Sequence, residues 1–168
     1  NTQFFYDLAK KLNVNFDVWQ KGSDTTHHFP ATQKLWELCL KSGDIYKKSY
    51  KGLYCVGCET FYTQEELDKN GECFEHPGKK LEEVEEENYF FKLSQYKEQL
   101  IELLESEKLA IIPNYRKNEV LAFLKGDLQD ISISRSNARA KNWGVEVPND
   151  DSQRMYVWFD ALNIYQSG

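Results

Sequence analysis

Three cysteines and one histidine form the most distinctive chemical pattern in the sequence. Cys55 and Cys58 are separated by two residues, as are Cys73 and His76, and fourteen residues lie between the two pairs. Thiolates and imidazoles are the ligands that Zn²⁺ takes in tetrahedral sites, and the two-residue spacing lets one turn aim both side chains at a common point. Because four protein ligands leave no position for water or substrate, the pattern predicts a structural zinc site.

Two other interpretations of these residues remain open at this point, namely free thiols beside an unrelated histidine, and a disulfide. Four cysteines in 168 residues are too few for a disulfide scaffold, and no export signal is apparent. The clustering of three of them favours a metal site in a reducing compartment. The fourth, Cys39, lies four residues after Leu35 on an apolar helical face and is predicted to be a core thiol.

The composition narrows the class of protein that can carry such a site. The chain is 40% apolar and 29% charged with a net charge of −6, a balance that excludes intrinsic disorder and a module held to nucleic acid by positive charge alone. No apolar run approaches the roughly 20 residues needed to cross a bilayer. The length suits one domain or two small ones, and the ends at Asn1 and Gly168 lead us to expect a piece of a longer protein.

Apolar spacing predicts the elements that position these residues. Leucines, isoleucines and aromatic residues at helical intervals predict helices over residues 2–12, 31–41, 94–107 and 115–125, with Ser94 as a cap. Short β-branched or aromatic runs predict strands at residues 45–46, 52–54, 60–62, 131–134 and 155–159.

Polar residues mark the turns and ends of these elements. Residues 22–30 and 148–153 are predicted as a loop and a polar turn, and residues 63–66 as the capped start of a short helix. The acidic run over residues 82–87 is predicted to be a solvated edge strand or turn rather than a cation site. Asp160 is expected to cap a final helix.

Several separate stretches make the chain resemble the bacterial-type methionyl-tRNA synthetase family over nearly its whole length. Any one of them is a weak signal, whereas their order and spacing together are specific. They are Gly43-Asp44-Ile45-Tyr46, Tyr54-Cys55-Val56-Gly57-Cys58-Glu59-Thr60-Phe61, Asn88-Tyr89-Phe90-Phe91-Lys92-Leu93, Asn118-Glu119-Val120-Leu121, Ile133-Ser134-Arg135 and Tyr156-Val157-Trp158-Phe159-Asp160-Ala161-Leu162.

The resemblance implies an α/β fold in which parts of a Rossmann-type catalytic domain flank a small mixed α+β connective insertion with a zinc knuckle. On this basis we expect residues 1–43 to end the first Rossmann half, residues 44–128 to form the insertion, and residues 129–168 to start the second half. The ligands Cys55, Cys58, Cys73 and His76 resemble those of the family's single-zinc variants.

The resemblance also implies a reaction. The family joins methionine to ATP as an adenylate and then passes the acyl group to tRNA(Met). We therefore expect methionine and ATP as substrates, Mg²⁺ as the ion that accompanies ATP, and tRNA(Met) as the partner. The resemblance also implies a cytoplasmic ligase with no membrane association. Neither of the family's two ATP motifs, His-Ile-Gly-His and Lys-Met-Ser-Lys-Ser, is present in these 168 residues. We therefore expect the chain on its own to be inactive.

Part of the amino-acid pocket is implied within the chain. The family's contacts to the methionine side chain are matched, by position, by Trp158, Ala161 and Tyr165. Without the resemblance, this stripe of aromatic residues would indicate core packing. Arg135 matches a family arginine near the reaction centre, where a guanidinium can orient a carboxylate or offset phosphate charge, and a surface arginine after a strand is equally compatible. Leu162 is assigned to packing only.

Two histidines and two rival functions complete the expectations. His27 and His28 fall in a loop that the resemblance places near the catalytic cleft, and we expect both to be solvated rather than catalytic.

A free-standing zinc-binding interaction module is one alternative function, but it offers no reason for the segment from Tyr156 to Tyr165. A synthetase for leucine, isoleucine or valine is another, but its insertion is generally much larger than the stretch from Asp44 to Gln129.

Overall fold

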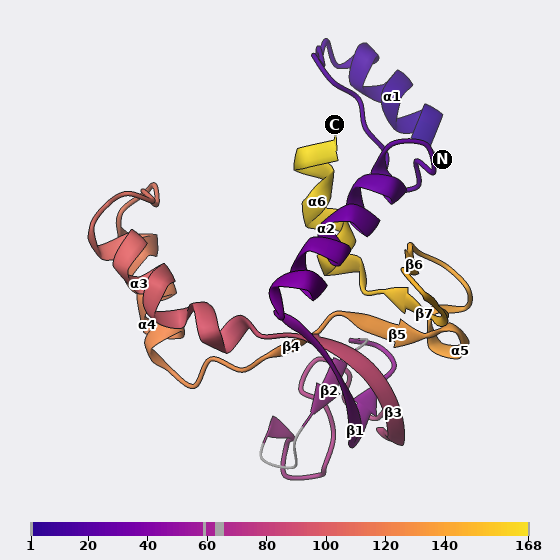
Figure 1. Ribbon diagram of the computed structural model, residues 1–168, viewed down its shortest axis with the longest axis vertical. Coiled ribbons are helices and arrows are strands. Elements are labelled where there is room, and N and C mark those ends of the chain that lie inside the picture. Colours follow the sequence, from indigo (N-terminus) through magenta and orange to yellow (C-terminus); the bar gives the residue numbers. More distant parts are fainter. Residues whose placement is uncertain (1, 59, 63–65, 168) are drawn as a thin grey trace.

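The computed structural model describes residues 2–58, 60–62 and 66–167 of the chain. It is a mixed α/β molecule, as predicted, with a central body, a protruding helical arm and a small knuckle at the far end of a long hairpin (Figure 1). The elements in chain order are α1 (Thr2–Lys11), α2 (His28–Ser42), β1 (Ile45–Cys55), β2 (Thr60–Tyr62), β3 (Glu82–Phe91), the 3-10 helix η2 (Leu93–Tyr96), α3 (Lys97–Glu105), α4 (Tyr115–Lys125), β4 (Ile131–Ser132), β5 (Ser134–Ser136), α5 (Asn137–Ala140), β6 (Glu146–Val147), β7 (Asp150–Met155) and α6 (Val157–Ser167).

Helices α2 and α6 lie side by side in the body (Figure 1). Trp36 of α2 is fully buried and meets the ring of Phe159 of α6 edge-on, with the ring centroids 5.3 Å apart. The buried amide of Asn163 donates to the Thr32 hydroxyl at 2.9 Å and fixes the register of the two helices. The core continues into the sheets through Ile45, Ile133, Val145, Val147 and Met155.

A long hairpin carries the chain from the body to the knuckle. Strands β1 and β3 pair antiparallel from Ile45 opposite Phe91 to Tyr54 opposite Glu82, in a sheet of order β2-β1-β3-β4. The acidic run over residues 82–87 is therefore strand, as one of the two expectations had it. It is not uniformly solvated, because the side chain of Glu86 is only 12% exposed and pairs with Arg139 at 2.7 Å.

The second sheet, β5-β7-β6, contains the main departures from prediction. Residues 150–153 belong to β7 rather than to a turn, and the helix α6 starts at Val157, inside the predicted strand over residues 155–159. A short apolar run does not distinguish a strand from a buried helix by its periodicity. Here the helix prevails because it buries Phe159 against the body, and Asp160 lies in the first turn rather than at the cap.

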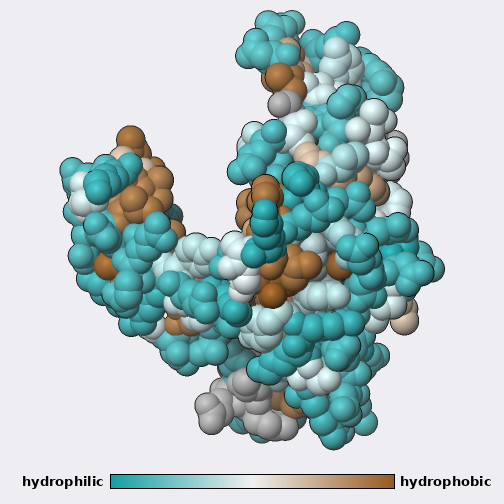
Figure 2. Space-filling view, viewed as in Figure 1, coloured by the Kyte–Doolittle hydropathy of each residue, from teal (hydrophilic) through white to brown (hydrophobic). Residues whose placement is uncertain are grey.

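The arm is a helical hairpin of α3 and α4 with its own small core of Leu104, Leu124 and Leu128. Figure 2 shows apolar surface on the arm and on the body around the hollow that separates them. Ser94 does not cap a helix as predicted, because its hydroxyl donates to the Asp130 carboxylate at 2.6 Å and it lies within η2. The expected helix start over residues 63–66 lies outside the described residues except for its last position.

All strand pairs within the described part of the chain are antiparallel. The parallel sheet of a Rossmann domain is thus not among the described pairs, and the divisions at residues 43 and 128 stay predictions. No helix within the described ranges has the length and apolar character required to cross a membrane.

Candidate functional site

The structure brings the four predicted metal ligands together at the knuckle. Cys55 ends β1, Cys58 follows in the next turn, and Cys73 and His76 come from the loop before β3. The ligand atoms of all four lie within 4.8 Å of one another. Cys55 is held by strand pairing, and the His76 amide donates to the Cys73 carbonyl at 3.1 Å across its turn, so the cluster is fixed from both sides.

The distances in the cluster suit a four-coordinate ion. The Sγ atom of Cys58 lies 3.3 Å from the Sγ of Cys73 and 3.1 Å from Nδ1 of His76, and that nitrogen lies 3.7 Å from the Sγ of Cys55. Zn–S and Zn–N bonds arranged tetrahedrally give ligand separations of about 3.5–3.8 Å. Only small movements separate the observed arrangement from a closed Cys₃His site.

Gly57 and Tyr62 shape the surroundings of the ligands. A Cβ atom at position 57 would lie 2.5 Å from the His76 ring, so only glycine lets the imidazole cover this turn. The Tyr62 hydroxyl donates to the Sγ of Cys58 at 3.3 Å and accepts from the Cys73 thiol at 3.6 Å. Such neighbours hold metal ligands in orientation.

The thiols of the cluster titrate as a group. Although burial opposes ionisation, hydrogen bonds with Tyr62 and His76 lower the pKa of the Cys73 thiol to about 6. The Tyr62 hydroxyl favours the Cys58 thiolate, but burial and the adjacent sulfurs outweigh it and raise the pKa of Cys58 to about 12. One thiolate forms readily, and its negative charge opposes ionisation of the next thiol. A bound divalent cation offsets this repulsion because it attracts all of the thiolates.

All four cysteines are free. Cys39 is not part of the cluster and packs, partly buried, against the body core, in agreement with the prediction of a core thiol. Burial and the nearby Asp44 carboxylate raise the pKa of its thiol.

Arg135 is not a surface residue after a strand, because it lies within β5 and is only 9% exposed. Its Nη1 donates to the Ser132 hydroxyl at 2.8 Å and to the Ser134 carbonyl at 2.7 Å. Its guanidinium stacks over the Tyr156 ring, 4.1 Å from the centroid. The group is therefore a fixed cation, as a role in orienting an anion requires.

The predicted methionine contacts lie on one side of α6, at positions 158, 161 and 165. Trp158 is 62% exposed and Tyr165 is 86% exposed, so the stripe is not packed in the core of this chain. Trp158 and Arg135 line the same cavity, of about 1360 Å³, which is bounded by α2, α6 and the sheet of β1 and β3, whereas Ala161 and Tyr165 are outside its lining. Leu162, assigned to packing, is instead 61% exposed and lines that cavity.

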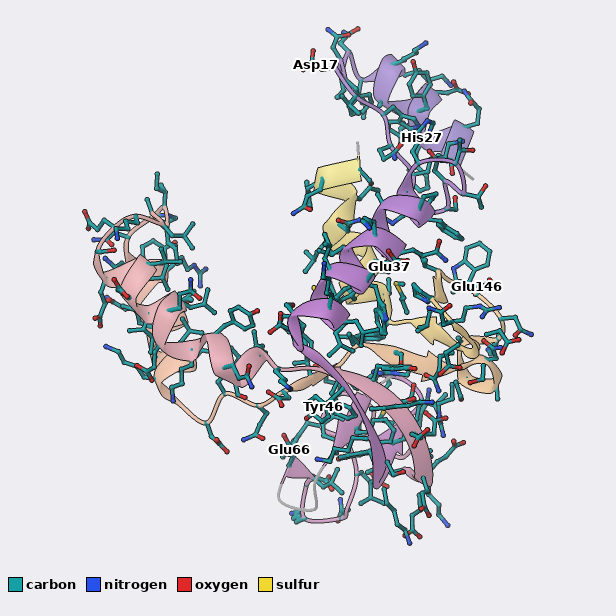
Figure 3. The ribbon with its side chains drawn as sticks, in the orientation of Figure 1. Asp17, His27, Glu37, Tyr46, Glu66 and Glu146 are labelled. Carbon is teal, nitrogen blue, oxygen red and sulfur yellow. The ribbon has the colours of Figure 1, made fainter. Side chains whose placement is uncertain are left out.

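The two histidines differ from each other. His27 is exposed, pairs with Asp24 at 3.0 Å and is labelled in Figure 3 at the start of α2. The prediction of a solvated loop is wrong for His28, which begins α2, is fully buried and lies 2.8 Å from the Ser167 hydroxyl through Nδ1. Its burial lowers the pKa of the imidazole, because the charged form loses its hydration.

Asp160 is a candidate that the sequence argument missed. Its side chain is 9% exposed, and burial raises the pKa of the carboxyl to about 6. The available signal is an acidic residue inside the apolar run over residues 156–162, a pattern that equally predicts a helix cap. A desolvated carboxyl beside a cavity is a typical feature of a functional site.

Comparison with known proteins places the whole chain in one group. Residues 1–167 match the family model described as tRNA synthetases class I (M). The chain is 40% identical over 167 residues to the methionine–tRNA ligase of Brucella suis biovar 1 (strain 1330), covering 98% of this chain and 32% of that protein. It is 42% identical over 164 residues to the methionine–tRNA ligase of Nostoc sp. (strain PCC 7120), covering 96% of this chain and 30% of that protein.

Comparison with a solved structure indicates the same family. The methionyl-tRNA synthetase of Mycobacterium tuberculosis in complex with methionyl-adenylate superimposes with a TM-score of 0.84 at 36% identity, covering 98% of this chain and 32% of that one. The chain thus spans about a third of the length of the relatives it matches.

Proposed function

The chain belongs to the class I tRNA synthetase family for methionine, and we propose that it forms the zinc-bearing insertion and part of the methionine pocket of a ligase that joins methionine to tRNA(Met). The observation that carries the proposal is a match over residues 1–167, since a likeness confined to the metal ligands would suit a zinc-binding interaction module equally well. The alternative of a synthetase for leucine, isoleucine or valine is disfavoured by relatives that are named methionine–tRNA ligases.

The proposed division of the chain follows the family. Residues 1–43 end one Rossmann half, residues 44–128 are the connective insertion and residues 129–168 begin the second half. The hairpin of β1 and β3 and its knuckle lie within the proposed insertion, as does the arm of α3 and α4. The two proposed Rossmann pieces meet in the body through α2 and α6.

The proposed metal is a structural Zn²⁺ held by Cys55, Cys58, Cys73 and His76. The supporting observations are the donor set, the mutual distances and the low exposure of Cys55 and Cys73, at 3% and 1%. When bound, the ion supplies folding energy and no chemistry, because protein atoms take all four positions. The carboxylates, indoles and arginines of the body would then carry out substrate binding.

The proposed substrate site is on the exposed side of α6. The indole of Trp158 and the ring of Tyr165 offer polarisable faces for a thioether, and the small Ala161 between them leaves space for it. Arg135, fixed by Tyr156 and two serine oxygens, would orient the methionine carboxylate or offset the charge of the reacting phosphate.

The proposed reaction needs ATP and Mg²⁺ as well as methionine and tRNA, and the two ATP motifs of the family are absent from these 168 residues. We therefore expect the chain on its own not to exchange pyrophosphate into ATP, since phosphoryl chemistry depends on positioned donors. We propose the cytoplasm as its location, consistent with free cysteines.

The test is a substitution in the natural full-length protein. Ala161→Leu should raise the KM for methionine by roughly ten- to two-hundredfold in pyrophosphate exchange and leave the KM for ATP nearly unchanged, because the added group fills an apolar pocket. Ala122→Leu, on the exposed side of α4 in the arm, is the matched control and should alter neither. A folded Ala161→Leu enzyme with an unaltered methionine requirement would exclude the pocket assignment.

A further inference from the structure

A second cavity lies behind the first turn of α6, on the side away from Trp158. It measures about 350 Å³ and is bounded by the end of β1, the α5 turn and the start of α6. Arg135 and Tyr156 line both cavities, so this stacked pair is the wall between them. A ligand in the second cavity would lie next to the same guanidinium that faces the proposed methionine site.

Cations predominate in this cavity. Arg135, Arg139 and Lys141 line it, against the single carboxyl of Asp160. Arg139 is held in place, because its guanidinium lies 4.1 Å from the Tyr54 ring centroid, its Nε donates to Glu86 at 2.7 Å and its Nη2 lies 3.8 Å from Glu82. These two carboxylates offset the charge of Arg139, so this guanidinium is a rigid donor and Lys141 contributes the positive charge that attracts an anion.

Two other side chains of the cavity have no partner within the described ranges. The Lys141 side chain makes no ion pair or hydrogen bond there, and its positive φ of 53° ends α5 and turns the chain. Trp143 is 77% exposed although it is a large aromatic residue, and its indole stacks on no other ring of those ranges. An indole and an ammonium held at the rim of one cavity are groups available to a ligand.

Asp160 supplies the third available group. The residue is 9% exposed and lines the cavity, and no hydrogen bond or ion pair involves its carboxyl in the part of the chain that the structure describes. Partial desolvation of a carboxyl without a partner is costly, and a ligand donor would relieve that cost. Hydroxyl and amino groups are the donors of matching chemistry.

We propose that this cavity binds a single nucleotide, with its base against Trp143, its phosphate at Lys141 and Arg139, and a hydroxyl or amino donor at Asp160. The nucleotide has two possible sources, ATP and the 3′-terminal nucleotide of tRNA. Both sources follow from the proposed function, and the inference rests on that function in this respect. A planar aromatic ring, an anion and a hydrogen-bond donor in one molecule satisfy all three kinds of group. Stacking on an aromatic side chain contributes substantially to the binding of an unpaired base.

The direct test is binding to the full-length protein, without reference to catalysis. AMP and a short single-stranded RNA with a free 3′ end are titrated in a calorimeter, so that the readout does not depend on the tryptophan that is substituted. Trp143→Ala should weaken binding by roughly five- to a hundredfold, and Trp143→Phe should restore most of it, because stacking needs an aromatic face. Phe74→Ala, which removes an aromatic side chain of similar exposure at the knuckle, is the matched control and should leave binding unchanged.

A second arm identifies the source of the nucleotide. If it comes from ATP, Trp143→Ala and Lys141→Gln should raise the KM for ATP in pyrophosphate exchange. If it comes from tRNA, they should raise the KM for tRNA in aminoacylation by a larger factor than the KM for ATP, and Lys141→Gln should reduce the salt dependence of tRNA binding.

The outcomes separate the two proposals. Nucleotide binding that is unchanged in Trp143→Ala, Lys141→Gln and Asp160→Asn would overturn the cavity assignment, even in an enzyme that activates methionine. Loss of binding in these variants would support it, even if the unaltered protein showed no pyrophosphate exchange and the proposed function were therefore wrong.

Discussion

The knuckle and the α6 surface are the two candidate sites of this molecule, and they are built in opposite ways. The knuckle collects its four ligands from residues 55–76, and its inner thiols are nearly inaccessible. The α6 surface depends on a helix, on β5 and on the cavity bounded by α2, α6 and the sheet of β1 and β3, and its aromatic residues are exposed. The first site is therefore complete within one short segment, whereas the second exposes large apolar side chains to a substrate or to further protein.

The two regions also differ in what can hold them together. The body has a core around the fully buried Trp36, Ile133 and Val145, whereas Cys73 is the one hydrophobic residue classed as buried among the described residues of 56–81. Apolar burial of about 25 cal/mol per Å² stabilises the body but is scarce in the knuckle. The proposed Zn²⁺ would supply the folding energy there.

The largest expected effect of this difference is on metal binding. Cys73→Ser should reduce zinc from about one ion per chain to nearly none, because structural Zn²⁺ contributes roughly 10–16 kcal/mol of apparent binding energy through its complete ligand set. Residues 54–80 should then exchange their amide hydrogens faster, while α2 and α6 stay protected. Elemental analysis and hydrogen exchange measure both effects.

Cys39→Ser is the control for this change and should retain the metal, because Cys39 packs against the body core. A Cys73→Ser protein with a full complement of zinc would show that the proposed ligand set is wrong.

A substitution in the body should lower the stability of the body and leave the zinc content unchanged. Trp36→Ala should lower the free energy of unfolding of the body by about 3–5 kcal/mol, because the indole is fully buried against Tyr89 and Phe159. Trp36→Phe, a milder truncation, should cost less and keep the body folded. Urea unfolding followed by circular dichroism gives the stability, and zinc content should be unaltered in both variants if the knuckle is independent.

The third prediction concerns the pH dependence of the body. Burial raises the folded-state pKa of Asp160 to about 6 from the usual 3.8, so the folded state binds this proton more tightly than the unfolded state. Stability is lost as the pH rises from about 4 to about 6, with a limit of about 3 kcal/mol above that window.

Asp160→Asn removes the charge, so it should be more stable than the parent at pH 7.5 and no more stable at pH 4, as judged by urea midpoints at the two pH values. The exposed neighbour Asp151, changed to Asn, should alter stability by less than about 0.5 kcal/mol at either pH. An equal gain for Asp160→Asn at both pH values would contradict the burial argument.

The smallest effect is expected at Gly57. Gly57→Ala places a Cβ atom 2.5 Å from the His76 imidazole, which must move away from the other ligands. Overpacking of this kind costs about 1–2 kcal/mol, equivalent to roughly tenfold weaker zinc affinity in a chelator competition. Gly22→Ala, where a Cβ meets nothing within 4 Å, should leave the affinity unchanged.

Much of the local structure could be predicted from the sequence. The helix over residues 115–125 and the strand at residues 60–62 have the predicted bounds, because apolar spacing and flanking breakers act over a few residues. The separate strands predicted at residues 45–46 and 52–54 are parts of one strand, because β1 runs unbroken from Ile45 to Cys55 by pairing with β3. Cross-strand pairing is a distant contact, and local patterns do not contain it.

The ligand set of the knuckle and the membership of a family of synthetases followed from the sequence alone, because residue types at fixed short spacings carry both signals. Only the tertiary structure decided that Val157 begins a helix, that His28 and Asp160 are buried, and that Trp143 and Lys141 share a cavity with Arg139. Burial and neighbourhood depend on which distant segments pack together. That packing places α6 against α2 and α5 beside the end of β1, contacts that no stretch of a few residues determines.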